Sequence, residues 1–413
     1  MKIVIINISD RIGGSGIATY RVAEALRKDL HNEVFYLVRT KSVNHASIYT
    51  TTANKFLSKI ERLFNIGMNL LGLQYLWLPF SPRFIYKKLK QEKPDVIWLN
   101  NLIGGYFVIG DLIKISKIAS TVWTMHDMWP FTANASHTFG DESWKNMKAG
   151  KNEKNIYPAI GLPTGNWLIK RKKKIYDCSS ITFIAPSEWM YNLSIQSPLL
   201  KKRKIELIPH GIDTDIFKPM GKFDLRKKMY IPEHASVIMF SAEKLKNNIF
   251  KGGADLIKVL NYLNHLTKEK IYVLLAGKDN LENIEYLKNI QPVNLGYINS
   301  DERMSEAYNT CDVFVYPTKA DSVSLVLMEA IACGIPCVSF AMGGTVGIIK
   351  DGYNGFSIPN GDYKLAAEKT FELLQNKNKY EEFSKNARTY AVEKFNLATI
   401  AKRYQRLFEN IQK

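Results

Sequence analysis

Cysteine is scarce in this 413-residue chain, and long apolar runs are missing. The four cysteines, Cys178, Cys311, Cys333 and Cys337, form no CxxC pair, which argues against a disulfide framework and favours a reducing cytosol. No apolar run reaches the roughly 18 residues that a membrane-spanning helix requires. The first residues, MKIVIINIS, run straight into a glycine loop and are expected to form a strand rather than a signal peptide. We therefore expect a cytoplasmic protein.

Acidic residues are also in short supply, but only in the first half of the chain. Residues 1–210 contain 30 Lys and Arg against 15 Asp and Glu, whereas the remainder contains 27 against 24. A basic half attracts polyanions such as nucleic acid, anionic lipid or a phosphorylated substrate. The basic clusters at 87–90, 170–174 and 201–204 are more often solvated faces than binding sites.

Short buried strands and amphipathic helices alternate along the whole chain. Runs such as KIVIINI, DVIWLN and STVWTMH are followed in the second half by SVIMFSA, IYVLLAG and DVFVYPT. Alternation of this kind predicts βαβ units with parallel sheets, and 413 residues exceed one core, so we expect two doubly wound α/β domains. Ligands of such sheets bind at the carboxyl ends of the strands, which places the chemistry in a cleft between the domains.

Two regions depart from this regular alternation. Residues 54–93 combine helical apolar spacing with aromatic and basic residues. This pattern fits a membrane-surface helix as well as a pair of ordinary core-facing helices. Residues 140–175, polar and then very basic, are expected to form a long surface excursion.

Two polar motifs follow strands in the first half. Gly13 and Gly14 stand between the first strand and a helix expected to begin near Ile17, where glycine would let the backbone approach a ligand and the helix N-terminus would bind oxygen atoms. A tight structural turn explains these glycines equally well. His126 and Asp127 follow the strand STVWT, where a histidine would hydrogen-bond a hydroxyl or phosphate. The alternative is a structural histidine.

The strongest motif lies in the second half, between a strand ending near Thr318 and a helix over 325–332. Asp321 stands at the helix entrance, and Glu329 lies inside the helix among apolar residues. The N–H groups of residues 323–326 would face a diphosphate, which the helix dipole favours. A carboxylate buried at Glu329 requires a partner, and a ribose diol is a suitable one.

The run CDVFVYPTKADSVSLVLMEAIACGIPCVSFAMGGTVGIIKDGYNGF resembles the signature of the family 4 retaining glycosyltransferases. The resemblance extends to IPHGIDTDIFKP and NIFKGGADLI, and HDMWPFT is similar to a branch that builds bacterial surface polysaccharides. It implies the GT-B fold, in which two Rossmann-like domains face each other across a cleft. The expected divisions are an acceptor domain at 1–205, a nucleotide-sugar domain at 206–394 and a C-terminal helix at 395–413 that packs back on the first domain.

Residue by residue, the resemblance implies three residues near the reacting atoms and two acceptor contacts. Lys251 would neutralise the diphosphate, Asp321 would lie near the donor sugar, and His126 would touch that sugar or the developing charge. Gly13 and Asp127 would contact the acceptor. The implied donor contacts are Glu329 on the ribose, Ser322, Val323, Ser324, Leu325 and Gly14 near phosphate, Ile298 on the base, and either Lys244 or Lys246 in place of an arginine of the family.

The resemblance also implies that the reaction uses no metal or other cofactor. We expect a nucleotide-sugar donor, UDP-linked by preference and GDP-linked as an alternative, and a saccharide or lipid-linked acceptor. An anionic surface on the inner membrane face is an expected partner and nucleic acid is not. Departures include Asp321 where the family usually has Glu, and Val346-Gly347 where a Glu is usual. The competing hypotheses are a sugar-nucleotide epimerase or hydrolase, a polyanion-binding protein, and a nucleotide-binding subunit without catalysis.

Overall fold

The computed structural model describes residues 1–52, 54–246, 248, 250–281, 284 and 286–412, which separate into two compact units. Unit 1 contains residues 1–211 together with 398–413, and unit 2 contains residues 212–397. The boundaries expected from the sequence, after residues 205 and 394, lie a few residues before these.

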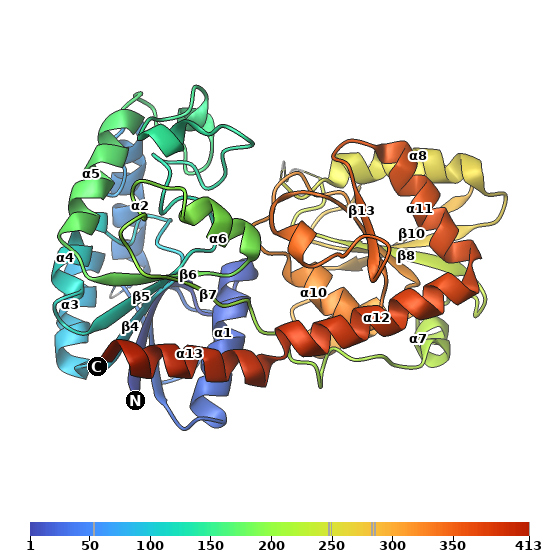
Figure 1. Ribbon diagram of the computed structural model, residues 1–413, viewed down its shortest axis with the longest axis horizontal. Coiled ribbons are helices and arrows are strands. Elements are labelled where there is room, and N and C mark those ends of the chain that lie inside the picture. Colours follow the sequence, from blue (N-terminus) through green and yellow to red (C-terminus); the bar gives the residue numbers. More distant parts are fainter. Residues whose placement is uncertain (53, 247, 249, 282–283, 285, 413) are drawn as a thin grey trace. The chain divides into compact units, whose positions relative to one another are not determined.

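Unit 1 is built on a parallel sheet of seven strands in the order β3-β2-β1-β4-β5-β6-β7 (Figure 1). Its inner strands are mostly buried, with all four residues of β4 buried, because helices cover both faces of the sheet. The strands are β1 (Lys2–Ser9), β2 (Glu33–Thr40), β3 (Ile48–Thr50), β4 (Val96–Leu99), β5 (Ser120–Thr124), β6 (Ile181–Ala185) and β7 (Ile205–Leu207).

The helices of unit 1 include the last helix of the chain, which returns after unit 2 is complete. Trp98 of β4 packs against Tyr404 and Phe408 of that helix, with ring centroids 4.9 and 5.7 Å apart. Ser120 donates a hydrogen bond of 2.9 Å to the carbonyl of Ile411. The helices are α1 (Gly13–Lys28), α2 (Lys55–Leu70), α3 (Ser81–Glu92), α4 (Leu112–Ile115), α5 (Gly165–Asp177), α6 (Glu188–Ser194) and α13 (Leu397–Gln412), with 3-10 turns at Ile109–Asp111, Ser143–Asn146 and Glu153–Asn155.

Unit 2 repeats this architecture with a parallel sheet of six strands in the order β10-β9-β8-β11-β12-β13. The strands are β8 (Ser236–Ser241), β9 (Ile271–Ala276), β10 (Ile290–Gly296), β11 (Val313–Tyr316), β12 (Cys337–Phe340) and β13 (Gly355–Ile358). The helices are α7 (Lys222–Lys228), α8 (Gly253–Leu266), α9 (Asp301–Thr310), α10 (Leu325–Ala332), α11 (Tyr363–Gln375) and α12 (Lys377–Phe395), with a 3-10 turn at Gly343–Gly347. The α10 bounds agree with the helix expected at 325–332.

The two sheets share one topology, and the prediction of two doubly wound Rossmann-like domains is confirmed. In each sheet the strand order reverses once, between β1 and β4 in unit 1 and between β8 and β11 in unit 2. Loops leave in opposite directions at such a switch point and open a crevice beyond the carboxyl ends of the two strands. Ligand binding is therefore expected after β1 and β4, and after β8 and β11.

Several local expectations need correction. Helix α1 begins at Gly13 and not near Ile17, so the glycines form its first turn. The segment over 140–175 is not wholly on the surface, because Trp144 and Lys172 are both buried. No helix in the described part of the chain has the length and apolar character that crossing a bilayer requires.

Candidate functional site

Two loops meet at the switch point of unit 2, and glycine permits their close approach. A Cβ atom on Gly252 would lie 1.8 Å from the carbonyl oxygen of Pro317, and one on Gly253 would lie 1.8 Å from that of Leu245. The hydroxyl of Thr318 donates a hydrogen bond of 2.8 Å to the carbonyl of Phe250. The start of α8 is therefore held against the segment that leaves β11.

Lys251 and Asp321 form an ion pair at this switch point. The Lys251 ammonium lies 2.6 Å from Asp321 Oδ2, and the Tyr316 hydroxyl donates to the same oxygen at 2.8 Å. Burial disfavours the charge on Lys251, but Asp321 and Tyr316 outweigh this effect and hold its pKa above the ordinary value. The loops thus keep a lysine cation fixed beside a carboxylate that accepts two hydrogen bonds.

The N-terminus of α10 lies next to this pair and is not closed by a side chain. Ser324 at the N-cap makes no side-chain capping bond, and the first turn carries no acidic residue. The Ser324 hydroxyl is buried without a hydrogen-bond partner among the described residues. Unpaired N–H groups and an unpaired buried hydroxyl at a helix N-terminus provide donors for an anion.

The backbone before α10 is fixed by the glycine pair of the turn at 343–347. A Cβ on Gly343 would lie 2.2 Å from the Asp321 carbonyl oxygen, and one on Gly344 would lie 2.0 Å from that of Ser322. Gly344 also donates its N–H to the Asp321 carbonyl at 2.8 Å. The glycine pair therefore positions the segment that contains Asp321, Ser322 and Val323.

Glu329 lies inside α10 with 6% of its surface exposed. Its Oε2 atom accepts a hydrogen bond of 3.0 Å from the Tyr308 hydroxyl. Burial and then the nearby Glu329 carboxylate raise the pKa of Tyr308 well above its usual value, so this hydroxyl remains a donor. The expected burial of Glu329 is confirmed, and its expected contact with a ribose stays a prediction.

The remaining donor contacts expected in unit 2 lie on its loops. Lys244 and Lys246 follow β8 with exposed side chains, and the Lys246 N–H lies 3.3 Å from Asp279 Oδ2. Leu325 is the first residue of α10, and Ile298 is half-buried just beyond β10.

The glycines of unit 1 serve different purposes. Gly13 has φ of +73°, a conformation that glycine adopts without strain, and a Cβ on Gly14 would meet nothing within 4 Å. A Cβ on Gly16, in contrast, would lie 2.8 Å from the Ser9 hydroxyl. Gly16 is thus required by the fold, whereas space beside Gly14 is open to a ligand.

His126 lies beyond β5 in a network of uncharged groups. Its Nε2 atom is 2.9 Å from the Asn100 side-chain oxygen, which also accepts a hydrogen bond from Thr19 at 2.9 Å. The ring stacks on that of His210, with centroids 5.2 Å apart and planes at 25°. Burial, and then His210, lowers the pKa of His126 well below its usual value. Burial and the neighbouring His210 ring therefore favour a neutral imidazole, whose Nε2–H donates to Asn100.

His210 is a candidate site residue that the sequence interpretation missed. Burial and then Arg21 lower the pKa of His210 to about 4. It comes shortly after β7, just as His126 comes shortly after β5. That shared position after a strand is the signal that would have identified it.

Asp127 lies beside a buried lysine. Burial raises the pKa of Asp127 to about 6, although a 2.9 Å hydrogen bond from the Trp129 N–H and the Lys172 charge oppose this rise. Lys172 donates to the carbonyls of Trp129 at 2.5 Å and Thr132 at 3.1 Å, and burial lowers its pKa to about 7 despite Glu153 and Asp127. This lysine of the basic cluster is therefore not on a solvated face, because it holds the loop after His126.

No group of three or more His, Cys, Asp or Glu side chains that could hold a metal ion occurs among the described residues. Asp213, which resembles part of a DxD motif, instead accepts hydrogen bonds from the N–H groups of Asp215 and Ile216 at 3.0 and 3.1 Å. It therefore closes a turn. The expectation that the reaction uses no metal stays a prediction.

Two family models match successive parts of the chain. The model described as Glycosyltransferase Family 4 matches residues 12–216, and the one described as Glycosyl transferases group 1 matches residues 222–390. Each unit thus has a counterpart of its own among known families.

Curated relatives are distant. N-acetyl-alpha-D-glucosaminyl L-malate synthase of Bacillus anthracis is 21% identical over 52% of this chain and 56% of its own length. The capsular polysaccharide biosynthesis glycosyltransferase CapM of Staphylococcus aureus is 26% identical over 58% and 64%. UDP-Gal:alpha-D-GlcNAc-diphosphoundecaprenol alpha-1,3-galactosyltransferase of Escherichia coli is 24% identical over 76% and 74%. The first six curated relatives that this chain matches, two of them named above, are covered over 38% to 64% of their own length.

Solved structures share the fold over nearly the whole chain. Sucrose-phosphate synthase from Thermosynechococcus elongatus has a TM-score of 0.69 at 16% identity, covering 99% of this chain and 98% of that one. Anabaena HepE in complex with UDP-glucose has a TM-score of 0.68 at 15% identity, covering 99% and 100%. At this identity the likeness concerns the fold.

Proposed function

Because this chain belongs to the family 4 glycosyltransferases with the GT-B fold, we propose that it is a retaining glycosyltransferase of surface-polysaccharide synthesis. It would move a hexose from a UDP-sugar to a saccharide carried on a lipid diphosphate. The observation that carries the proposal is the Lys251–Asp321 pair beside the uncapped N-terminus of α10. The UDP complexes of Anabaena HepE and the diphosphoundecaprenol acceptor named for the Escherichia coli relative support the choice of substrates.

In unit 2, the groups described are suited to a nucleoside diphosphate. During transfer the bond between the sugar C1 and the β-phosphate oxygen breaks, and negative charge grows on the diphosphate. Lys251 and the N–H groups at the start of α10 would stabilise that charge, which is a large contribution to catalysis in preorganised sites. Glu329 would accept hydrogen bonds from the ribose hydroxyls. These positive groups do the work that a divalent cation does elsewhere, so we propose transfer without a metal.

In a retaining reaction the new bond forms on the face from which the old one leaves. The acceptor oxygen would bond to C1, and its proton would pass to the departing phosphate oxygen, so no protein base is needed. His126 is kept neutral, and in this state it would hydrogen-bond sugar hydroxyls without attracting phosphate. Gly14, with open space beside it, would allow the donor phosphate and the acceptor to approach the backbone.

A lipid-linked acceptor requires the enzyme to reach a bilayer, and α2 has a suitable surface. The residues that α2 buries are polar: Glu61 is 3% exposed and accepts a hydrogen bond of 2.9 Å from the Ser81 N–H. Its apolar residues face outward, with Phe56 and Leu63 each 70% exposed. This orientation is the reverse of a core-facing helix. We propose that it inserts into the headgroup region of an anionic membrane.

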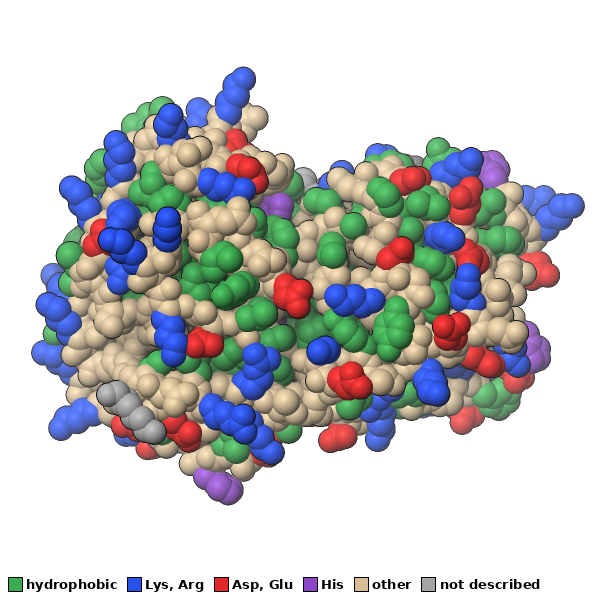
Figure 2. Space-filling view, viewed as in Figure 1, with side chains coloured by type: hydrophobic (Ala, Val, Ile, Leu, Met, Phe, Trp, Pro, Cys, Tyr) green, Lys and Arg blue, Asp and Glu red, His purple; other side chains and the backbone are tan. Residues whose placement is uncertain are grey.

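Charge on unit 1 supports this membrane proposal. Lys and Arg side chains stand along the margin of unit 1 over α3 and α5 (Figure 2). Wild-type protein should bind vesicles containing phosphatidylglycerol, and Phe56→Ser with Leu63→Ser should abolish binding without changing the melting temperature. Phe223→Ser, an exposed aromatic of unit 2, is the matched control. Wild-type protein that stays free of such vesicles at low salt contradicts the proposal.

The donor is tested by a thermal-shift comparison of UDP-, GDP- and ADP-sugars. A ligand that binds only the folded protein stabilises it by about 2.7 kcal/mol at a hundredfold excess over its Kd. We expect the UDP compounds to raise the melting temperature most. If a GDP-sugar gives the largest rise in melting temperature, the donor nucleotide is guanosine diphosphate and not uridine diphosphate. The absence of any shift would refute the donor site.

A further inference from the structure

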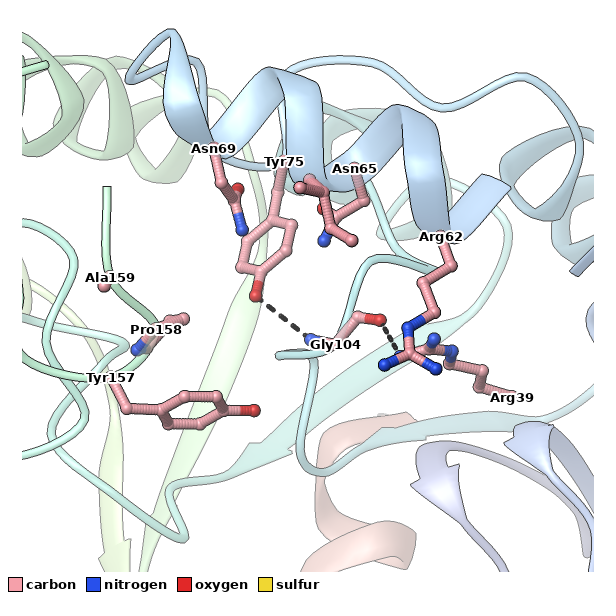
Figure 3. A pocket seen from close by; sticks show the side chains of 10 residues that line it. Arg39, Arg62, Asn65, Asn69, Tyr75, Gly104, Tyr157, Pro158 and Ala159 are labelled. Carbon is pink, nitrogen blue, oxygen red and sulfur yellow. Dashed lines mark hydrogen bonds between the residues drawn. The ribbon is translucent and has the colours of Figure 1, made fainter. Parts of the chain in front are cut away.

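A pocket of about 240 Å³ lies within unit 1 (Figure 3). Helix α2 forms one wall, the loop after β4 forms another, and residues 157–159 form a third. The lining residues are Arg39, Arg62, Asn65, Ile66, Asn69, Tyr75, Gly104, Tyr157, Pro158 and Ala159. None of the predicted site residues contributes to it.

The pocket has two cations and no acidic lining residue. Arg39, at the end of β2, donates to the carbonyl of Gly104, and Arg62 extends from α2 toward the same edge of the pocket. Two guanidinium groups at one pocket repel each other unless an anion lies between them. Guanidinium groups bind phosphate through paired hydrogen bonds, so this edge of the pocket is suited to a phosphate group.

The uncharged side-chain groups that α2 presents to the pocket are hydrogen-bond donors. The amide nitrogens of Asn65 and Asn69 point into the pocket (Figure 3), whereas their oxygens are buried. Amide N–H groups donate to the oxygens of sugar hydroxyls as well as to those of a phosphate. Tyr75 accepts the Gly104 N–H at 3.1 Å, which leaves its own hydroxyl hydrogen free to donate to a phosphate oxygen.

We propose that this pocket binds a glycosyl phosphate, namely the phosphate and the first sugar of the lipid-borne acceptor. The proposal rests on the proposed function for the identity of the acceptor. Arg39, Arg62 and Tyr75 hold the phosphate, and Asn65 with Asn69 holds the sugar hydroxyls. Helix α2 provides Arg62 and Asn65 to the pocket and exposes Phe56 and Leu63. The same helix therefore contacts the bilayer and the headgroup of a lipid lying in it.

The first experiment measures glucose 1-phosphate binding to the full chain by ligand-observed NMR, with UDP at saturation to occupy unit 2. Arg62→Gln should weaken binding at least tenfold. Lys59→Gln, which removes the same charge from an exposed position of α2, should weaken it less than twofold. If the two substitutions weaken binding equally, glucose 1-phosphate is attracted by the general positive charge of α2 and the proposed pocket site is wrong. The absence of binding to the wild type would also refute the site.

Two further comparisons test the sugar and the lipid. Glucose 1-phosphate should bind at least tenfold more tightly than inorganic phosphate, and equal affinities would overturn the role of the asparagines. A short-chain prenyl diphosphate glucose should bind more tightly still in the presence of phosphatidylglycerol vesicles. If it binds only as tightly as glucose 1-phosphate, the ligand is a free sugar phosphate and the lipid assignment is wrong.

The proposed donor reaction and the pocket fail in different ways. UDP affinity resides in unit 2 and should be unchanged in Arg62→Gln. Wild-type protein that does not bind UDP refutes the donor proposal, while the contrast between Arg62→Gln and Lys59→Gln for glucose 1-phosphate still decides the pocket.

Discussion

The two switch points share a strand order and differ in chemistry. In unit 2, a lysine, a carboxylate and an uncapped helix N-terminus stand after β8 and β11. In unit 1, the corresponding position after β4 holds the buried amide of Asn100, which hydrogen-bonds the neutral His126. The same architecture thus presents a charged site, the Lys251–Asp321 pair beside α10, in unit 2 and an uncharged hydrogen-bond network around His126 in unit 1.

In the proposed function, this difference between the two switch points corresponds to a division of labour. Phosphate is held by fixed positive charge, whereas a hydroxyl-rich sugar is held by neutral donors and acceptors that do not compete for phosphate. The glycines follow the same division. Those at the unit 2 switch point permit loops to pack against one another, and Gly14 in unit 1 faces open space.

Lys251→Met in the charged site of unit 2 is expected to have the largest effect. Removing one preorganised stabilising group typically costs about 100- to 1000-fold in kcat, and we expect a loss of that size. The substitution also leaves Asp321 without its ion-pair partner. The double variant Lys251→Met with Asp321→Asn should recover the melting temperature and not the activity. Activity that recovers along with stability would show that the pair is structural.

The neutral state of the buried histidines in unit 1 predicts a dependence of stability on pH. His210 has a folded pKa of about 4 against an unfolded value of about 6.5, so its contribution is fully present above pH 6.5 and is lost as the pH falls toward 4. Between pH 7 and pH 5 we expect a loss of about 2 kcal/mol, from about 1.4 kcal/mol per pH unit. Urea unfolding of wild type and His210→Asn measures it. The variant should lack this part of the pH dependence, and identical slopes would contradict the assignment.

Glu329→Gln tests whether unit 2 binds the ribose hydroxyls as well as the phosphates. The amide retains an oxygen for the Tyr308 hydroxyl but lacks the charge, so UDP affinity should fall about tenfold, equivalent to about 1.4 kcal/mol. Affinity for 2′,3′-dideoxy-UDP should not change, since that ligand has no ribose diol. Tyr308→Phe, which removes the donor alone, is the control. An equal loss for both nucleotides would mean that Glu329 acts only through the fold.

The smallest effect is expected for Gly14→Ala. A Cβ there meets no protein atom, so the free energy of unfolding should change by less than about 0.5 kcal/mol while acceptor turnover falls several-fold. Gly16→Ala should instead destabilise the protein, since its Cβ would lie 2.8 Å from the Ser9 hydroxyl. Unchanged turnover in Gly14→Ala would remove this glycine from the acceptor site.

The fold could be predicted from the sequence because both sheets are buried on both faces, which makes each strand a recognisable apolar run. The orientation of α2 could not, because apolar spacing predicts an amphipathic helix without indicating which side faces the core. The hydrogen bond from Ser81 to Glu61 and the packing of Asn65 against Gly105 decide that question, and both depend on residues further along the chain.

The candidate site divides in the same way. Asp321 and Glu329 lie in one continuous motif and could be recognised there, although their roles are still predictions. The stacking of His210 on His126 and the burial of Lys172 depend on tertiary contacts that no local pattern contains. The pocket of Arg39 and Arg62 draws on three separated segments and likewise has no local signal.

Because α13 belongs to unit 1, the unit whose synthesis begins first is the last to have all its residues. The ribosome makes most of unit 1 first, yet the face of Trp98 that Tyr404 and Phe408 cover stays exposed until the last residues emerge. Unit 2, contiguous in sequence, has all its residues before that point, and domains generally fold as units during synthesis. A chain truncated after residue 397 would therefore carry a complete unit 2 and an open, aggregation-prone unit 1.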